Sequence, residues 1–528
     1  MGLGKYLKNL SVSTDPVPVT NTTTPGQPPS KRQLYQSRVN RGPNLGSMFV
    51  LEKWITPHMF PEGDDHGKTS ELDAVEQALK AKGVDDTRTM FETHWREWIS
   101  DDDWRWLREM GATAVRVPIG YWMVGGGQFC DRTHFEDVHK VYQNAWDIFK
   151  DVVLRKAAEH EIGVLVDLHG LPGGANGADH SGTTVGEAKL WDSSRCQVQS
   201  YDVLKFLATE LTQFDNVVGL QILNEAPYES RDEDVQKTFY LKAINQIRSV
   251  NTEIPLVISD GWDLNRWVDI IKELEHHLSS ERGENASLGV IIDTHVYRCF
   301  SDDDKNKAPI DIINNIEEAL PNTENTVDIM VGEFSCVLDG QSWDKHNEGA
   351  HGSREELVKQ YGQRECAHFA QRACGFYFWT YKFKWGGGGE WGFREMLEKG
   401  ALSTVYGPLQ QRFPQDREPT DNYYEQALAH RCQQAVGNHA NYWQGQDPNR
   451  DWEHWRFEAG FRQAWADARA FDKWNHSEIG RRAAWKRARE LEHIRERGVG
   501  HDIIWVWRQG FDQGLQAFLE TRQYAFHG

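Results

Sequence analysis

Eight short runs of β-branched and other apolar residues recur between residues 44 and 382, and they constrain the fold more than any other feature of the sequence. Each run is apolar along its length and turns polar at its C-terminal end, and stretches that read as helices, such as 139–160 and 233–250, lie between the runs. Continuous apolar runs are typical of strands that are buried on both faces, as in parallel sheets. Eight alternations of strand and helix therefore predict an α/β fold, the (β/α)₈ TIM barrel. The runs are 44–52, 112–120, 163–170, 217–225, 255–261, 288–297, 327–335 and 373–382.

The amino-acid composition of the chain changes on both sides of this region. Residues 1–40 are rich in Pro, Thr and Ser, which predicts a flexible leader before a barrel over 41–435. Residues 436–528 read as a helical appendage that is dense in Trp, Arg and Glu. Within it, residues 455–463 (WRFEAGFRQ) weakly resemble residues 505–513 (WVWRQGFDQ). Aromatic residues at helical spacing favour core packing of the appendage, and binding of a partner or a longer substrate is the alternative.

Charge and cysteine usage exclude several classes of protein. The net charge of −20 argues against nucleic acid or an anionic membrane as the main partner, because both attract a positive surface. No apolar run is long enough to span a bilayer, and the first residues lack the apolar core of a secretion signal, so we expect a cytoplasmic location. The seven cysteines form no CxxC pair, which indicates reduced thiols rather than a zinc site or a disulfide framework.

Polar side chains gather at one end of the predicted barrel. They come from different runs, but each stands where its run ends, and barrel enzymes carry their catalytic groups at the C-terminal face of the strands. Taken singly, a Glu at a strand end, a His in a strand or a buried Arg is more often structural. A purely structural set would scatter over both strand ends. The residues are Glu52, Arg116, His169, Asn224, Glu225, His295, Tyr297, Glu333 and Trp379.

Two of these residues suit the hydrolysis of a glycosidic bond. Glu225 ends the fourth run and Glu333 ends the seventh, and these strands lie nearly opposite each other across the mouth of an eight-stranded barrel. Glycosidases use such a pair, one carboxyl group protonated and the other ionised. Tyr297 and Arg116 could hold Glu333 ionised. His169 and Asn224 could orient a sugar hydroxyl, and Trp379 offers a flat face to a sugar ring; the spacing of His and Cys residues implies no metal and no cofactor.

At these positions the chain resembles glycoside hydrolase family 5, in particular the fungal exo-β-1,3-glucanases. The resemblance runs from about residue 42 to about residue 410, and its order and spacing make it specific. The matching segments are 44–52 (NLGSMFVLE), 54–57 (WITP), 115–122 (VRVPIGYW), 167–170 (DLHG), 176–177 (NG), 181–182 (SG), 224–227 (NEAP), 295–297 (HVY), 332–334 (GEF), 378–382 (FWTYK) and 390–391 (EW).

The resemblance implies a retaining mechanism with two carboxyl groups about 5–5.5 Å apart. Glu333 is then the nucleophile, and Glu225 is the general acid and base, with a pKa raised by the charge of Glu333. The remaining polar residues at the strand ends would line a glucose subsite, where Glu52 binds outer hydroxyls of the terminal sugar and favours exo action. Phe300 would be half of an aromatic clamp at the entrance.

Two departures from the family leave the substrate open. Ala178 stands where the family has the Phe that forms the other half of the clamp, and Gly386–Gly389 form a glycine run that acts either as a lid or as a tolerated surface insertion. The leading hypothesis is an exo-acting β-glucosidase for β-1,3-glucan or its oligosaccharides. A β-glucosidase for glucosyl lipids or other hydrophobic glucosides is the first alternative. A non-catalytic carbohydrate-binding barrel is the second, and the presence of both Glu225 and Glu333 argues against it.

Overall fold

The computed structural model describes residues 13–20, 23, 26–60, 67–227, 233–282, 286–320, 326–499 and 503–527. The chain forms two compact units. The first comprises the residues up to Thr20 together with Asn40–Tyr406, and the second comprises Asn21–Val39 together with Gly407–Gly528. The predicted boundary after residue 435 falls inside a helix of the second unit, α17 (Asp421–Gln446), and part of the predicted leader also belongs to that unit.

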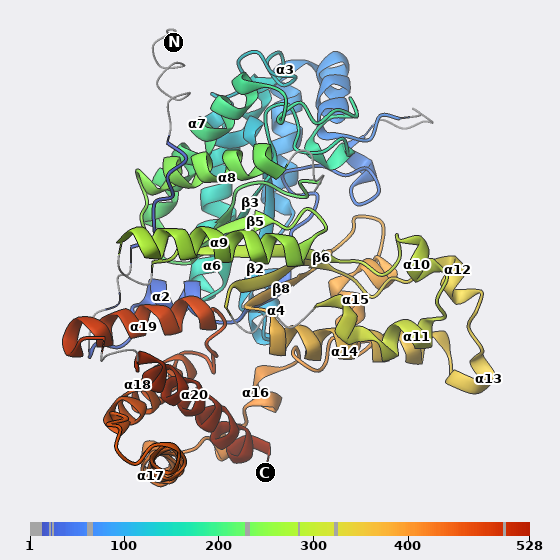
Figure 1. The fold of residues 1–528 in the computed structure, drawn as a ribbon. Coiled ribbons are helices and arrows are strands. Elements are labelled where there is room, and N and C mark those ends of the chain that lie inside the picture. Colours follow the sequence, from blue (N-terminus) through green and yellow to red (C-terminus); the bar gives the residue numbers. More distant parts are fainter. Residues whose placement is uncertain are drawn as a thin grey trace. The chain divides into compact units, whose positions relative to one another are not determined.

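The first unit is a (β/α)₈ barrel, as predicted (Figure 1). Its strands pair in parallel in the order β1-β8-β7-β6-β5-β4-β3-β2. The backbone N–H of Thr113 donates to the carbonyl of Arg41, and that of Leu45 donates to the carbonyl of Arg116, both at 2.8 Å, so the ends of this order meet beside β1 and β2. The strands are β1 (Asn40–Pro43), β2 (Ala114–Gly120), β3 (Gly163–Gly170), β4 (Val217–Gln221), β5 (Leu256–Ser259), β6 (Val290–Val296), β7 (Asp328–Phe334) and β8 (Gly375–Phe378).

The first strand differs from the prediction. Seven of the predicted runs contain their strands, but β1 ends at Pro43, one residue before the predicted run 44–52 begins. The backbone of Ser47 has φ 57°, a left-handed conformation that ends an extended segment. Met48 to Leu51 are still almost completely buried. The run 44–52 is therefore apolar because it is buried, although it forms a turn and not a strand.

Helices surround the barrel strands, and several begin at sequence-encoded caps. Ser70, Ser100 and Ser353 each open a helix with a capping box, in which the serine hydroxyl and an acidic residue three positions on satisfy free backbone N–H groups. The α-helices of this unit are α3 (Glu71–Glu97), α4 (Asp101–Glu109), α5 (Ala145–Phe149), α6 (Lys156–Glu159), α7 (Ser194–Glu210), α8 (Glu233–Arg248), α9 (Leu264–Arg282), α10 (Asp302–Lys305), α11 (Pro309–Asn314), α12 (Gly340–Trp343), α13 (Glu348–His351), α14 (Arg354–Arg372) and α15 (Phe393–Glu398). Short helical turns are η1 (Pro57–Met59), η2 (Tyr121–Gly126), η3 (His139–Tyr142), η4 (Lys150–Arg155), η5 (Asp179–Ser181), η6 (Leu211–Gln213), η7 (Ile316–Ala319) and η8 (Gly389–Trp391).

The second unit is helical and has its own aromatic core. Phe457, Phe461, Trp507 and Phe511 are at most 1% exposed within it, so these aromatic residues of the appendage pack as a core. The helices are α2 (Lys31–Ser37), α16 (Leu409–Arg412), η9 (Gln415–Arg417), α17 (Asp421–Gln446), α18 (His454–Lys473), α19 (Arg482–Arg497) and α20 (Ile504–His527). Across the described residues of both units, no helix combines the length and the apolar character that a bilayer span requires.

The weak internal repeat corresponds to two helices that pack on each other through equivalent glycines. A Cβ at Gly460 of α18 would lie 2.2 Å from the carbonyl oxygen of Trp507, and a Cβ at Gly510 of α20 would lie 2.1 Å from that of Phe457. Gly460 and Gly510 are equivalent in the repeat, as are Phe457 and Trp507. The contact is thus reciprocal, and the repeated glycine is the residue that lets the two backbones approach.

Candidate active site

A pocket of about 510 Å³ opens at the C-terminal ends of the barrel strands. It brings together eight of the ten residues that the sequence predicted for the site. Arg116 and His295 complete the set: Arg116 is fully buried, and His295 contacts the pocket residue Glu225 from beneath. The eight predicted residues in the lining are Glu52, His169, Asn224, Glu225, Tyr297, Phe300, Glu333 and Trp379.

Glu225 and Glu333 face each other across the floor of this pocket. A carboxylate oxygen of each, together with a ring nitrogen of His295, lies within 4.8 Å of the others. Glu333 is the penultimate residue of β7, and Glu225 follows β4 with φ 48°, an unusual conformation for a residue other than glycine. Retaining glycosidases hold their carboxyl groups about 5 Å apart, whereas inverting enzymes leave room for a water between them. The separation here is of the retaining kind.

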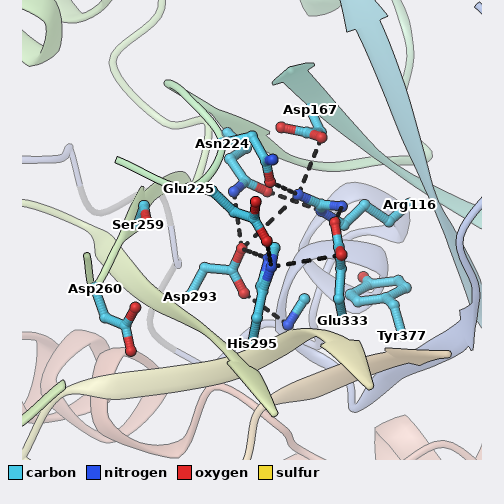
Figure 2. Close-up of polar contacts among 12 residues, drawn as sticks. Arg116, Asp167, Asn224, Glu225, Ser259, Asp260, Asp293, His295, Glu333 and Tyr377 are labelled. Atoms are coloured by element: carbon cyan, nitrogen blue, oxygen red, sulfur yellow. Dashed lines mark hydrogen bonds and ion pairs between the residues drawn. The ribbon is translucent and has the colours of Figure 1, made fainter. Parts of the chain in front are cut away.

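Arg116 of β2 organises the floor through a network of buried contacts (Figure 2). Its guanidinium donates to Glu333 Oε1 at 2.8 Å and to Asn224 Oδ1 at 2.7 Å, and it lies 3.0 Å from Asp167 Oδ2. It also donates to Asn44 and Gln221. Burial alone would lower the pKa of Arg116, but the neighbouring carboxylates raise it above its ordinary value. The arginine is therefore a permanent cation that fixes both the nucleophile candidate and Asn224.

Both oxygens of Glu333 are held by donors. Arg116 occupies Oε1, the hydroxyl of Tyr297 donates to Oε2 at 2.7 Å, and His295 Nδ1 lies 3.5 Å from Oε2. A positive charge and two hydrogen bonds stabilise the ionised form of a carboxyl group. Arg116 and Tyr297, the two residues that we expected beside Glu333, thus both contact its carboxyl group.

Glu225 stands between two imidazoles, which the sequence did not lead us to expect. His295 Nδ1 lies 2.8 Å from Oε1, and His180 Nε2 lies 3.2 Å from Oε2. Burial favours the neutral acid, but hydrogen bonds from His180 and His295 hold the pKa of Glu225 well below its ordinary value. This direction is opposite to the raised pKa that we predicted. The two imidazoles thus favour the ionised form of Glu225.

His169 and Asn224, which both line the pocket, are linked to each other and to Asp167 by polar contacts. His169 Nδ1 lies 2.7 Å from Asp167 Oδ2, and the amide of Asn224 donates to His169 Nε2 at 3.3 Å. Since the carboxylate can only accept, Nδ1 carries the proton and Nε2 accepts from Asn224. The side-chain carbonyl of Asn224 accepts a hydrogen bond from Arg116, so both ends of the Asn224 amide group are held.

Two aspartates beneath the pocket were missed by the sequence reasoning, although a signal for them exists. Asp167 stands two residues before His169 on β3, and Asp293 stands two residues before His295 on β6. Residues two apart on a strand share a face, so the repeated Asp-x-His pattern could have identified both. Asp293 accepts from His295 Nε2 at 3.2 Å and from the backbone N–H of Gly332 at 2.6 Å.

The upper wall of the pocket is aromatic. Trp54 and Trp262, which the sequence analysis did not place in the site, line the pocket with Phe300, and Trp391 lies 6.4 Å from the Phe300 ring. Trp262 is 58% exposed and Phe300 62% exposed. We refer to Trp54, Trp262, Phe300 and Trp391 as the aromatic rim. Ala178 is not among the lining residues.

Glu52 and the glycine run lie on one side of the rim. Trp54 Nε1 donates to Glu52 Oε2 at 2.9 Å, and burial raises the pKa of Glu52 to about 7. Gly386–Gly389 lead into η8, where the N–H of Gly389 donates to Glu395 at 2.8 Å. Next to the run, Trp385 Nε1 donates to the carbonyl of Trp54 at 2.6 Å. The run is thus anchored at both of its ends, and its role as a lid stays a prediction.

Comparisons with known proteins cover both the barrel and the C-terminal helices. Residues 424–522 match the family model described as the glucan 1,3-beta-glucosidase 3 C-terminal domain. An uncharacterized glycosyl hydrolase of Saccharomyces cerevisiae is 37% identical over 94% of this chain and 95% of its own length. Glucan 1,3-beta-glucosidase 3 of Schizosaccharomyces pombe is 32% identical over 94% of this chain and 98% of its own.

Among solved structures, the rutinosidase from Aspergillus niger shares the barrel fold. It superposes with a TM-score of 0.54 and 17% sequence identity, over 70% of this chain and 99% of its own. The two full-length relatives and the C-terminal match identify the chain as a glycoside hydrolase, and it belongs to the family that includes glucan 1,3-beta-glucosidase 3.

Proposed function

We propose that this glycoside hydrolase is a retaining, exo-acting β-glucosidase that releases terminal glucose from β-1,3-glucan or its oligosaccharides. The observation that carries the proposal is the pair Glu225 and Glu333, whose oxygens lie within 4.8 Å across a pocket floor. The name of the S. pombe relative supports the β-1,3-glucan substrate.

The first half of the reaction uses both carboxyl groups. Glu333, held by Arg116 and Tyr297, attacks the anomeric carbon and forms a covalent glycosyl-enzyme. Glu225 delivers a proton to the departing glycosidic oxygen. The bond from Tyr297 and the charge of Arg116 keep the carboxylate in place during the attack, which is the positioning that an intramolecular nucleophile requires.

The second half reverses these roles. Water enters from the side of Glu225, which now accepts a proton as the water attacks the anomeric carbon, and Glu333 departs. The glucose keeps its β-configuration because the carbon is attacked twice, from opposite faces.

Exo action is supported by the depth and chemistry of the pocket. Glu52, His169 and Asn224 present polar atoms to one sugar unit, and Trp379, which stacks on His169 at 6.3 Å, gives that unit a flat aromatic wall. Glu52 would bind outer hydroxyls of the terminal sugar, which favours binding of a chain by its end.

Glucosides with an apolar aglycone are a second candidate substrate class. The aromatic rim is widely exposed, and Ala178 contributes no second aromatic side chain to close the clamp. A hydrophobic aglycone would cover the exposed faces of Trp262 and Phe300, and each aromatic face removed from water adds to affinity.

The experiment compares wild type with Glu333→Ala, Glu225→Ala and Glu348→Ala, the last being an exposed glutamate of α13 used as a control. Substrates are p-nitrophenyl β-glucoside, laminari-oligosaccharides, cellobiose, glucosylceramide and a steryl glucoside. Wild type should release glucose. The rate of release should be about a thousandfold or more lower in Glu333→Ala, and it should equal the wild-type rate in the Glu348→Ala control.

Glu225→Ala adds a test of the mechanism. With the acid/base carboxyl removed, added azide should attack the glycosyl-enzyme and restore turnover of the p-nitrophenyl substrate as the β-glucosyl azide. An α-configured product, or full activity in Glu333→Ala, contradicts the proposal. Preference for a glucosyl lipid over every laminari-oligosaccharide moves the second substrate class ahead.

A further inference from the structure

His180 lies at the pocket, outside the set of residues that the sequence identified. It belongs to η5, the turn after β3, and its Nε2 is 3.2 Å from Glu225 Oε2. Its side chain is 24% exposed and lines the pocket. Its other ring nitrogen, Nδ1, is buried and has no hydrogen-bond partner within the described residues. The ring is therefore oriented by a single polar contact, the one to Glu225.

The loop that carries His180 is tied to Glu225 by a second connection. The side-chain amide of Asn176 donates to the backbone carbonyl of Glu225 at 3.1 Å. The carbonyl oxygen of the same side chain accepts from the backbone N–H of Ala178 at 3.0 Å and from the hydroxyl of Ser181 at 2.7 Å. One asparagine thus fixes the positions before and after His180 and the left-handed backbone of Glu225 together. This arrangement holds the backbone of the His180 loop against the backbone of Glu225.

His295 cannot take the same role. Its Nε2 is bonded to Asp293 and its Nδ1 is shared between Glu225 at 2.8 Å and Glu333 at 3.5 Å, with a side chain only 4% exposed. Loss of its proton would remove one of the positive charges beside Asp293, Glu225 and Glu333, and removing one partner of a buried ion pair costs free energy. His180 reaches the pocket and exchanges protons with solvent there, so it is the imidazole that can be discharged and recharged.

We infer that His180 stores the proton that Glu225 gives to the leaving group and recovers the proton that Glu225 takes from water. This inference rests on the proposed function. In the first half-reaction the proton moves from His180 Nε2 to Glu225, and Glu225 protonates the glycosidic oxygen as its bond to the anomeric carbon breaks and the bond to Glu333 forms. In the second, water attacks, the bond to Glu333 breaks, and the proton taken by Glu225 returns to His180. His180 acts through Glu225 and is thus a positioning residue.

The charges that face His180 support this role. The carboxylates of Glu225, Glu52 and Glu333 lie close enough to favour its charged form, and the ring of His169 packs against it with centroids 5.1 Å apart. Burial opposes its charge, but the hydrogen bond to Glu225 and these carboxylates raise the pKa of His180 to about 9. With one proton shared between His180 and Glu225, the protonated pair persists until the pH passes that value.

The test is the pH profile of His180→Gln, which keeps an N–H donor near Glu225 but cannot titrate. On phenyl β-glucoside, whose leaving group needs protonation, the alkaline limb of kcat/KM should move to lower pH by about one unit or more. At pH 8 the value should fall at least about tenfold. On dinitrophenyl β-glucoside, which departs without a proton, it should stay within about twofold. His134→Gln, an exposed histidine, is the matched control and should leave both profiles unchanged.

Two results would overturn the inference. An unmoved alkaline limb means that His180 does not hold the proton, and an equal loss on both substrates means that it only supports the loop. A second measurement on the wild-type protein, ¹⁵N NMR of the histidine rings with His180→Asn for assignment, should find His180 charged at pH 7; a neutral ring contradicts the inference. Failure of the proposed function is separate, because it would leave Glu225→Ala or Glu333→Ala active.

Discussion

Single residues of the site differ in how far the sequence predicts them. Glu225 and Glu333 are predictable because each ends an apolar run of a recognisable barrel, and this position marks candidate catalytic residues. His180 could not be identified in this way, since it lies in a loop whose path depends on Asn176. The direction of the Glu225 pKa was wrong for the same reason: it depends on an imidazole 45 residues away in the sequence, which no spacing pattern reveals.

Replacement of Arg116 tests the charge balance beneath the pocket. Arg116→Met leaves Asp167 and Glu333 buried without their cation, which should lower the free energy of unfolding by about 3–5 kcal/mol. Arg105→Met is the control, because Arg105 is 58% exposed and its pair with Asp102 should contribute less than about 1 kcal/mol. Urea unfolding of both variants measures the difference, and equal midpoints would show that the network is not stabilising.

At the scale of elements, burial was predicted better than conformation. The run 44–52 is as apolar as a barrel strand, yet it forms a buried turn because Ser47 adopts a left-handed backbone. Hydrophobicity indicates whether a segment is buried. It does not decide whether the buried segment forms a strand or a turn, because packing overrides the local backbone preference. The helical repeat shows the converse case, since the spacing of Gly and aromatic residues that its two copies share encodes the packing of α18 on α20.

The glycines of that contact give a test with a close control. In Gly510→Ala the new methyl group would lie 2.1 Å from the carbonyl oxygen of Phe457, so the variant should be destabilised by about 1–3 kcal/mol. Gly437→Ala, on an exposed position of α17 with nothing within 4 Å, should instead gain about 1 kcal/mol from helix propensity. Thermal unfolding should move in opposite directions for the two variants; a shift of equal sign argues against the glycine contact.

The cap of α4 gives a prediction on pH. Burial opposes ionisation of Asp103, but the backbone N–H of Ser100, the charge of Lys382 and the hydroxyl of Tyr381 lower its pKa to about 2. A depressed pKa stabilises the fold above the unfolded value near 4, and that contribution is lost as the pH falls towards 2. Asp103→Asn should therefore cost about 2 kcal/mol at pH 7, and the difference from wild type should shrink below pH 4. A difference that is constant between pH 7 and pH 3 contradicts this assignment.

At the scale of the whole molecule, the chain leaves and re-enters the second unit. Asn21–Val39 belong to that unit, then the barrel follows, and the chain returns at Gly407. Within the second unit, the ring of Tyr35 packs edge-on against Trp474 at 4.7 Å, and the guanidinium of Arg38 lies over the same indole. Sequence texture could not predict this assignment, because a Pro- and Thr-rich segment gives no sign of a distant packing partner.

A chain that ends at Tyr406 tests this connection. It lacks Trp474, so Arg38, which is 1% exposed in the full chain, should become accessible to trypsin. Buried Arg116 of the barrel should stay protected if the barrel folds without the second unit. Limited proteolysis with mass spectrometry compares the two chains. Cleavage after Arg38 at the same rate in both would show that the C-terminal helices do not protect the segment.

The order of these segments along the chain determines when the parts of the second unit are synthesised. The carbonyl of Ser37 accepts a hydrogen bond from the N–H of Gly480, which a ribosome adds roughly 440 residues later. At a synthesis rate of about 5–20 residues per second, roughly 20–90 s separate the synthesis of α2 from that of Gly480, and the barrel is synthesised in this interval. During that interval Trp474, against which the ring of Tyr35 packs, has not yet been synthesised. The contacts of α2 within the second unit therefore form only after the whole barrel has been synthesised.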